Sequence, residues 1–109
     1  MSDSRLDQLL NFLEESPKDS FLLFAVAKEY ETTGSLDKAL EYYIRLKTDD
    51  PDYIGLYYHL AKLYEELSED VRAMETYDVG IELAKKQADF HALSELNNAR
   101  TNLSIQMGN

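Results

Sequence analysis

The feature that most constrains this sequence is an internal duplication with a period of 34 residues. Residues 20–53 aligned with residues 54–87 give eight identical pairs, where ordinary composition predicts about two. The identical pairs are Leu22/Leu56, Ala27/Ala61, Lys28/Lys62, Tyr30/Tyr64, Glu31/Glu65, Ala39/Ala73, Glu41/Glu75 and Tyr43/Tyr77. A fixed period of this length is typical of repeats that bury their apolar faces against neighbouring copies.

Apolar periodicity and chain breakers predict an all-α fold of about six helices with short turns. The expected helices are roughly residues 3–15, 19–32, 35–48, 53–67, 71–86 and 89–106. Pro17 and Pro51 end two of them, because the residue before a proline avoids the α region. Gly34 is the residue expected to take a left-handed conformation after the second helix. No segment alternates with period two for long enough to predict a strand.

Composition argues against several classes of partner and location. The chain has 21 acidic and 11 basic residues, for a net charge of −10, so it should repel nucleic acid and anionic membranes. It contains no cysteine, which excludes disulfides, thiolate zinc sites and a cysteine nucleophile. Neither a membrane-spanning apolar run nor a signal-peptide pattern is found, so a cytoplasmic protein with no nucleic-acid or membrane partner is predicted.

The sequence carries no recognisable catalytic motif. It lacks G-x-S-x-G, a phosphate-binding glycine loop and H-E-x-x-H. His91 and Glu95 are four residues apart on one predicted helix face, but two ligands alone are weak evidence for a metal site. Adjacent acidic residues such as Glu14-Glu15, Asp49-Asp50 and Glu65-Glu66 are abundant, and most are assigned to solvated helix faces and helix N-termini. We therefore predict no enzyme activity, no catalytic residue, no cofactor and no metal site.

The period and the residue pattern resemble the tetratricopeptide repeat (TPR) family, with its signature W-x₂-L-G-x₂-Y, A-x₃-F and P. The matching residues in the first copy are Leu23, Val26, Ala27, Tyr30, Ala39, Tyr43 and Pro51. In the second copy they are Tyr57, Leu60, Ala61, Tyr64, Ala73 and Tyr77, with Lys85 where proline is usual. The resemblance implies helical hairpins stacked in a right-handed α-α superhelix.

The resemblance also suggests how the chain is organised. A single TPR-like domain over residues 1–109 would comprise an N-terminal half-repeat helix (1–17), two repeats (18–52 and 53–87) and a C-terminal capping helix (88–109). The capping helix is out of register by one residue, so a small insertion or deletion is expected after Gly80. Glycine inside a helix costs about 1 kcal/mol relative to alanine, and close backbone approach would explain it.

Small and aromatic residues recur at positions where the helices should pack. Alanines are expected where the two helices of a hairpin cross, because a larger side chain would force the axes apart. Tyrosines are expected to fill the space between successive hairpins, with each hydroxyl bonded at the edge. The alanines are Ala27, Ala39, Ala61 and Ala73, and the tyrosines are Tyr30, Tyr43, Tyr64 and Tyr77.

In the TPR family the first helices line a concave groove that binds partner proteins or peptide segments. Here the resemblance places the partner-binding residues at Phe21, Phe24, Lys28, Glu31, Tyr58, His59, Lys62 and Glu65, with Ala25 and Gly55 beside them. Aromatic anchors with two lysines suit a peptide that carries hydrophobic and acidic groups. Phe24, Lys28 and His59 do not match the family's clamp for chaperone carboxylate tails, so that ligand is not expected.

The function expected from the resemblance is non-catalytic protein–protein interaction, as a small adaptor, scaffold or co-chaperone-like module. Two repeats give only a short groove, so self-association could extend the surface. The alternative is a structural homo-oligomerisation unit without a peptide ligand, in which Phe21 and Phe24 meet their symmetry mates. A third possibility is that these two rings simply pack beneath the first helix.

Overall fold

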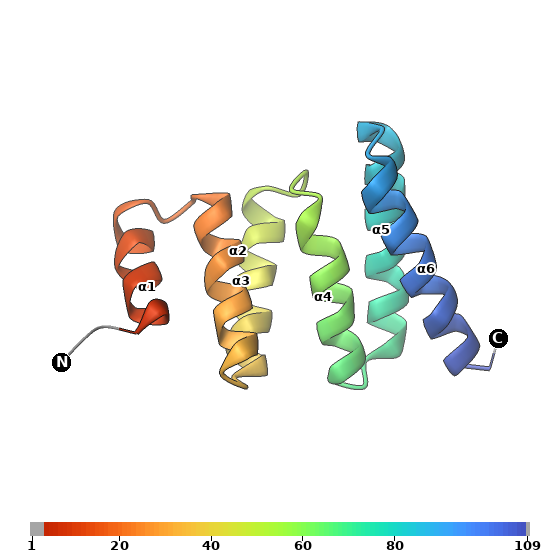
Figure 1. Ribbon diagram of the computed structural model, residues 1–109, viewed down its shortest axis with the longest axis horizontal. Coiled ribbons are helices and arrows are strands. Elements are labelled where there is room, and N and C mark those ends of the chain that lie inside the picture. The colour runs from red at the N-terminus through yellow and green to blue at the C-terminus, as the bar shows by residue number, and fades with distance from the viewer. Residues whose placement is uncertain (1–3, 109) are drawn as a thin grey trace. The chain divides into compact units, whose positions relative to one another are not determined.

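In the computed structural model, which describes residues 4–108, six helices form and no strand does within that range (Figure 1). The helices are α1 (Arg5–Glu15), α2 (Ser20–Thr32), α3 (Leu36–Asp49), α4 (Gly55–Glu66), α5 (Asp70–Gln87) and α6 (Phe90–Gln106). The all-α fold and its helical hairpins are confirmed, and the helix ends lie within two residues of those expected. The expected start of the first helix, at residue 3, lies outside the described residues.

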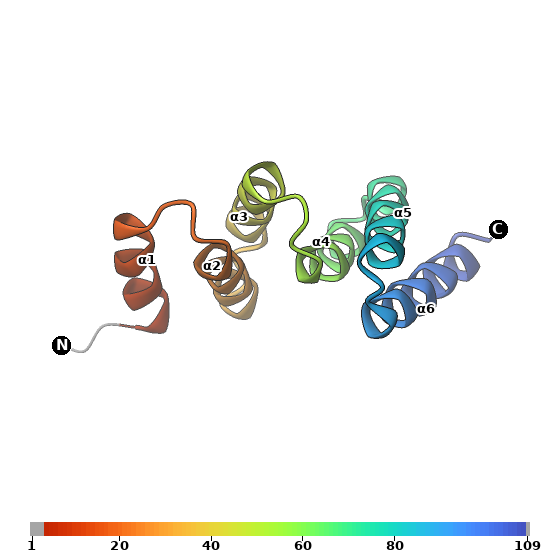
Figure 2. The same ribbon diagram turned by 90° about the horizontal axis from the view of Figure 1, so that it is seen from above.

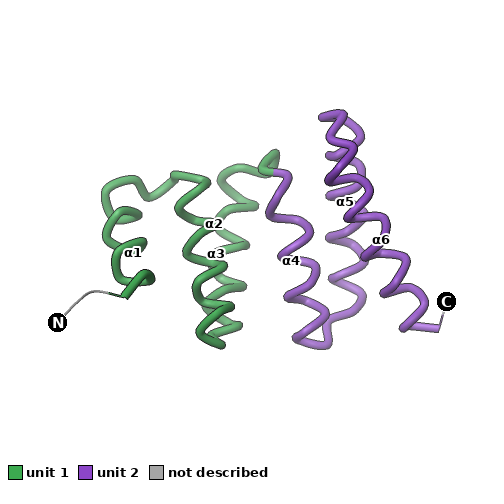
Figure 3. Tube along the Cα trace, in the orientation of Figure 1, with its two compact units in different colours: residues 1–53 green, residues 54–109 purple. Residues whose placement is uncertain are grey.

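The chain packs as two compact units, the first ending at Tyr53 and the second beginning at Ile54 (Figure 3). The first unit contains α1, α2 and α3, and the second contains α4, α5 and α6. Seen from above, α2 lies beside α3 in one unit and α4 lies beside α5 in the other (Figure 2). The division between units falls at the boundary between the two aligned copies of the sequence.

Side-chain caps and left-handed residues fix several helix ends. The Asp19 carboxylate accepts a hydrogen bond from the Leu22 amide at 3.0 Å, and Asp89 does the same for the Ala92 amide at 3.0 Å. These bonds satisfy amides that have no partner inside the helix. Gly34 has the predicted left-handed conformation, with φ of 84°, while Ser68 takes φ of 60° at the equivalent place in the second copy.

In the first unit, α2 and α3 bury a contiguous apolar face. Ala27 and Ala39 are fully buried, as expected for residues at a close helix crossing. The other buried residues of this hairpin are Leu23, Val26, Tyr43 and Leu46. The α1 helix packs against α2 and buries Leu13.

In the second unit, α5 lies between α4 and α6 and packs closely on both. A Cβ atom at Gly80 would lie 2.7 Å from the Tyr57 Cβ atom and 3.1 Å from a Leu96 methyl carbon. The predicted close approach at Gly80 is therefore confirmed. Ala61 and Ala73 are fully buried, like their counterparts in the first unit.

The α5 helix is where the repeat departs from its period. It has 18 residues, whereas α3 has 14. The extra turn lies beyond Gly80, the part of the chain in which an insertion or deletion was predicted. The α6 helix that follows buries a single stripe of Leu96, Ala99 and Leu103.

Over residues 4–108, no helix combines the length and the apolar character that crossing a bilayer would require.

Candidate partner-binding faces

Both hairpins contain the same partly buried tyrosine–glutamate hydrogen bond. The Tyr43 hydroxyl donates to Glu31, and the Tyr77 hydroxyl donates to Glu65 at 2.5 Å. Each bond joins the two helices of one hairpin, although the sequence placed these tyrosines between hairpins. The carboxylates of two predicted partner-binding residues are therefore held in place from within their own hairpins.

Burial raises the pKa of Tyr43 and of Tyr77 well above the ordinary value for tyrosine. The hydrogen bond to the neighbouring carboxylate, and its negative charge, raise the pKa further. An ionised phenolate would lose its hydration and face a second negative charge. Both tyrosines therefore stay protonated and act as hydrogen-bond donors throughout the neutral pH range.

The α2 face carries the first four predicted partner-binding residues. Phe21 is 65% exposed and projects from the helix. Phe24 is half-buried, and its ring centroid lies 6.2 Å from that of Tyr43 in an edge-on contact. Lys28 and Glu31 are also half-buried. The structure thus brings Phe24 and Glu31 together on Tyr43, whereas Phe21 stands apart.

Tyr53 belongs to the same face, although the sequence predicts it at the start of the next helix. It lies in the turn before α4, and its ring centroid is 5.5 Å from that of Phe24. Burial raises the pKa of Tyr53, and the carboxylates of Asp50 and Asp19 add to the effect. In the sequence, Tyr53 is recognisable only as an aromatic residue directly after the Asp49–Asp52 turn. That position does not indicate that its ring contacts Phe24.

The α4 face carries the other four predicted residues. Tyr58 and His59 are half-buried, with ring centroids 5.4 Å apart and planes at 84°. Lys62 is exposed, and Glu65 is half-buried and bonded to Tyr77. Tyr58 and Lys62 are one helical turn apart, as Phe24 and Lys28 are on α2. The α2–α3 and α4–α5 hairpins therefore each present an aromatic ring and a lysine at the same two positions of their first helix.

The pair considered as metal ligands lies on α6. His91 Nε2 is 3.6 Å from a Glu95 carboxylate oxygen, and both side chains are exposed. No cluster of three or more histidine, aspartate or glutamate side chains suited to a metal ion occurs among the described residues.

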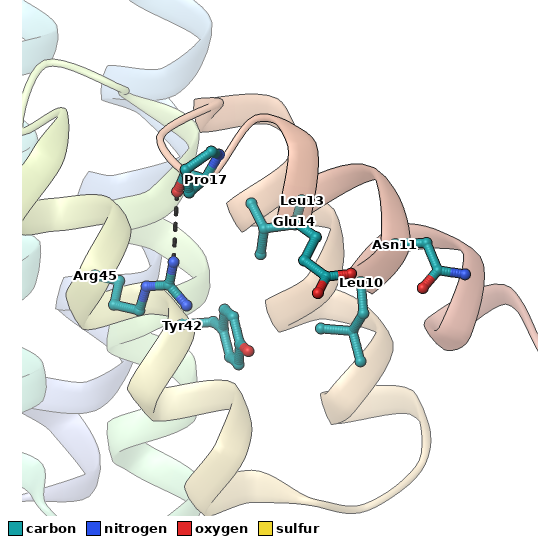
Figure 4. Close-up of a pocket in the computed structure, with 7 residues that line it drawn as sticks. All are labelled: Leu10, Asn11, Leu13, Glu14, Pro17, Tyr42 and Arg45. Atoms are coloured by element: carbon teal, nitrogen blue, oxygen red, sulfur yellow. Dashed lines mark hydrogen bonds between the residues drawn. The ribbon is translucent and has the colours of Figure 1, made fainter.

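A further cleft, which the sequence does not predict, lies between α1 and α3 in the first unit (Figure 4). This α1–α3 cleft has a volume of about 420 Å³ and is lined by Leu10, Asn11, Leu13, Glu14, Pro17, Tyr42 and Arg45. No residue of α2 or α4 lines it, so it shares none of the predicted partner-binding residues. Only the three-residue spacing of Tyr42 and Arg45 hinted at a contact in this region.

Comparison with known families and curated proteins gives no match for this chain. Among solved structures, the chain is similar to a tetratricopeptide repeat domain protein from Salinibacter ruber studied by NMR. The two share 40% identity and a TM-score of 0.77 over 80% of this chain and 88% of that one. A crystal structure of a tetratricopeptide repeat domain protein from the same organism is also 40% identical to this chain. Its TM-score is 0.76, and the match covers 79% of this chain and 97% of that one.

More distant structures share the fold. The TPR2B domain of yeast Sti1, in a complex with pHsp70, is 17% identical, with a TM-score of 0.86 over 93% of this chain and 81% of that one. PcrH, in complex with the chaperone binding region of PopD, is 14% identical, with a TM-score of 0.86 over 94% of this chain and 77% of that one.

Proposed function

Because the chain belongs to the tetratricopeptide repeat family, we propose that it is a non-catalytic protein-interaction module that binds a partner segment through α2 and α4. The proposed residues are Phe21, Phe24, Lys28 and Glu31 on α2, and Tyr58, His59, Lys62 and Glu65 on α4. Residues 18–52 and 53–87 would act as the two repeats of one domain, flanked by 1–17 and 88–109. The expected cytoplasmic location stays a prediction.

The observation that carries this proposal is the repeated pairing of an aromatic ring with a lysine one turn later. Phe24 and Lys28 on α2 correspond to Tyr58 and Lys62 on α4, and both aromatic rings are half-buried. Anchored rings with a solvent-facing part are typical of the few residues that dominate protein–protein affinity. The structures of Sti1 and PcrH with bound partners support the proposal by analogy of fold.

The lysines indicate the chemistry of the partner. They recur at the same repeat position in a chain with a net charge of −10, so they would attract acidic groups locally against the overall field. An exposed charge pair contributes only about 0–1 kcal/mol, so the aromatic rings should supply most of the affinity and the lysines the orientation. A segment with apolar and acidic side chains is therefore the proposed ligand.

A test of the proposal starts from a partner captured from the native source and identified by mass spectrometry. Titration calorimetry should show that Phe24→Ala and Tyr58→Ala each weaken binding by about 2 kcal/mol, the level of an interface hot spot. Phe12→Ala, which removes an exposed ring on α1, is the matched control and should bind like the parent. Unchanged affinity in both test variants, with circular dichroism showing an intact fold, would contradict the proposal.

Exposed Phe21 favours the alternative of a homo-oligomer. Sedimentation at several concentrations distinguishes the two functions. Two results together would favour the oligomerisation unit. The protein would self-associate in a way that Phe21→Ser abolishes, and its affinity for the partner would not depend on Phe24.

A further inference from the structure

We propose that the α1–α3 cleft is a second binding site, which takes a large apolar side chain of a partner peptide together with an adjacent carboxylate. The site is separate from the α2 and α4 faces, because none of their residues lines the cleft. Its two components are an apolar wall and the guanidinium group of Arg45 (Figure 4).

The apolar part of the cleft is formed by Leu10 and Leu13 from α1 and by Tyr42 from α3. Leu13 is buried, while Leu10 and Tyr42 are half-buried and keep part of their surface in contact with solvent. The cleft volume of about 420 Å³ falls within the range of about 300–1,000 Å³ that is usual for ligand sites. It has room for a leucine or phenylalanine side chain with its adjoining backbone.

Arg45 supplies the charge. Its guanidinium carbon lies 4.9 Å from the centroid of the Tyr42 ring, and Nη2 donates to the Pro17 carbonyl oxygen at 3.4 Å. These two contacts hold the group at one end of the cleft (Figure 4). Within residues 4–108 it forms no ion pair, and its other donors have no protein acceptor. A planar guanidinium with unused donors matches a carboxylate, which can accept two parallel hydrogen bonds.

The cleft also contains one carboxylate, that of Glu14, which raises the question of whether a basic segment would bind instead. Glu14 is exposed, whereas Arg45 is half-buried. An exposed charge is already well solvated and gains little from pairing. Contacts with Tyr42 and Pro17 already hold Arg45 at the cleft, so Arg45 loses less conformational freedom when it pairs, and the geometry favours an acidic segment.

A short acidic peptide suits the site better than a second copy of this chain. Each copy carries a net charge of −10, so two copies repel each other strongly. A peptide with one or two carboxylates experiences less repulsion, and salt screens charges farther away than about 8 Å. The local attraction of Arg45 can then decide the outcome.

The test uses the full chain labelled with ¹⁵N and a pool of terminally blocked hexapeptides. Each peptide has one central leucine or phenylalanine, with aspartate, glutamate, serine or glycine elsewhere. We expect this pool to shift the amide resonances of the cleft residues Leu10, Glu14, Tyr42 and Arg45. A pool with lysine in place of the acidic residues, and one with alanine at the centre, should leave these resonances unchanged.

Variants assign the effect to Arg45. We expect Arg45→Glu and Arg45→Gln each to lower the affinity for the acidic pool roughly tenfold. This is the effect of losing one charge-assisted hydrogen bond. Lys38→Glu is the matched control, because it makes the same charge change on α3 at an exposed lysine whose ammonium lies 3.8 Å from Glu41. It should bind like the parent.

Three results would overturn the proposal. The first is that Arg45→Gln, with its amide spectrum otherwise intact, binds the acidic pool as tightly as the parent. The second is that the lysine pool binds and that Glu14→Gln abolishes this binding. The third is cleft shifts that depend on protein concentration without peptide, which would identify a second copy as the occupant.

Discussion

The α2–α3 and α4–α5 hairpins share their internal contacts but differ where a further helix packs. Both have fully buried alanines at the helix crossing and a tyrosine hydroxyl bonded to a glutamate twelve residues earlier. At one aligned position, however, the first hairpin has buried Leu46 and the second has Gly80. The additional helix of the first unit packs on α2, whereas that of the second packs tightly on α5. The residues that pack inside a hairpin are therefore the same in both copies. The residues that face the additional helix differ between the copies.

The turns between the paired helices give a second contrast. Gly34 is left-handed in the first copy, and Ser68 adopts the same kind of conformation in the second. Glycine takes this conformation freely, while other residues meet a steric cost of about 1–2 kcal/mol. The backbone shape of the turn is therefore shared, and only the first copy has the residue suited to it.

The largest expected effect tests the shared contact. Tyr43→Ala and Tyr77→Ala should each lower the free energy of unfolding by about 3–5 kcal/mol, because each removes a fully buried aromatic ring. Urea denaturation of the two variants should give similar losses. A large loss in one hairpin and none in the other would show that the two copies are not built alike.

The next prediction concerns the position at which the hairpins differ. Gly80→Ala should destabilise the protein by about 1–2 kcal/mol, although alanine favours helix by about 1 kcal/mol. The new methyl group would lie 2.7 Å from the Tyr57 Cβ atom, which cannot move without shifting α4. Val79→Ala, at an exposed site beside it, is the control for thermal melts and should change little. A stabilised Gly80→Ala protein would refute the close approach of α4, α5 and α6.

A smaller effect should appear at alkaline pH. The pKa values of Tyr43 and Tyr77 are raised, so their native-state stabilisation is complete below about pH 10, where unfolded tyrosine titrates. Above that pH the unfolded chain releases these protons first, and stability falls as the pH rises toward the folded pKa.

Tyr43→Phe should therefore lose about 0.5–1.5 kcal/mol at neutral pH and show a shallower decline at alkaline pH. Urea titrations of the parent and the variant between about pH 7 and 11 measure both quantities. Tyr77→Phe should behave in the same way. Parallel curves for parent and variants above pH 10 would contradict the raised pKa values.

The smallest effect sharpens the contrast between the turns. Ser68→Gly relieves a left-handed residue but makes the unfolded chain more flexible, so a net stabilisation of about 0.5 kcal/mol is expected. Gly34→Ser, the reverse exchange in the first copy, should destabilise the protein by a similar amount. Thermal melts of the pair should shift in opposite directions, and shifts in the same direction would mean that the turns differ.

The sequence predicted the features that depend on local geometry. Helix positions follow from apolar spacing, and buried Ala27 and Ala61 follow from the register of the repeat. Gly80 was also recognisable, because glycine is unfavourable inside a helix without a packing reason.

The sequence did not reveal contacts that join distant parts of the chain. The α1–α3 cleft combines side chains from α1, the Pro17 turn and α3, and the Tyr53–Phe24 contact joins a turn to the middle of α2. The glutamate partners of Tyr43 and Tyr77 likewise depend on how two helices cross. Periodicity identifies the face of a helix and not the residue it meets.

Partner binding through α2 and α4 is tested most directly by amide hydrogen exchange of the full chain with and without its captured partner. Binding slows exchange where it suppresses local opening. We predict slower amide exchange in the helical turns of α2 that contain Phe24 and Lys28. The same is predicted for the helical turns of α4 that contain Tyr58 and Lys62. Slower exchange confined to α5 and α6, with α2 and α4 unchanged, would contradict the assignment of the partner-binding faces.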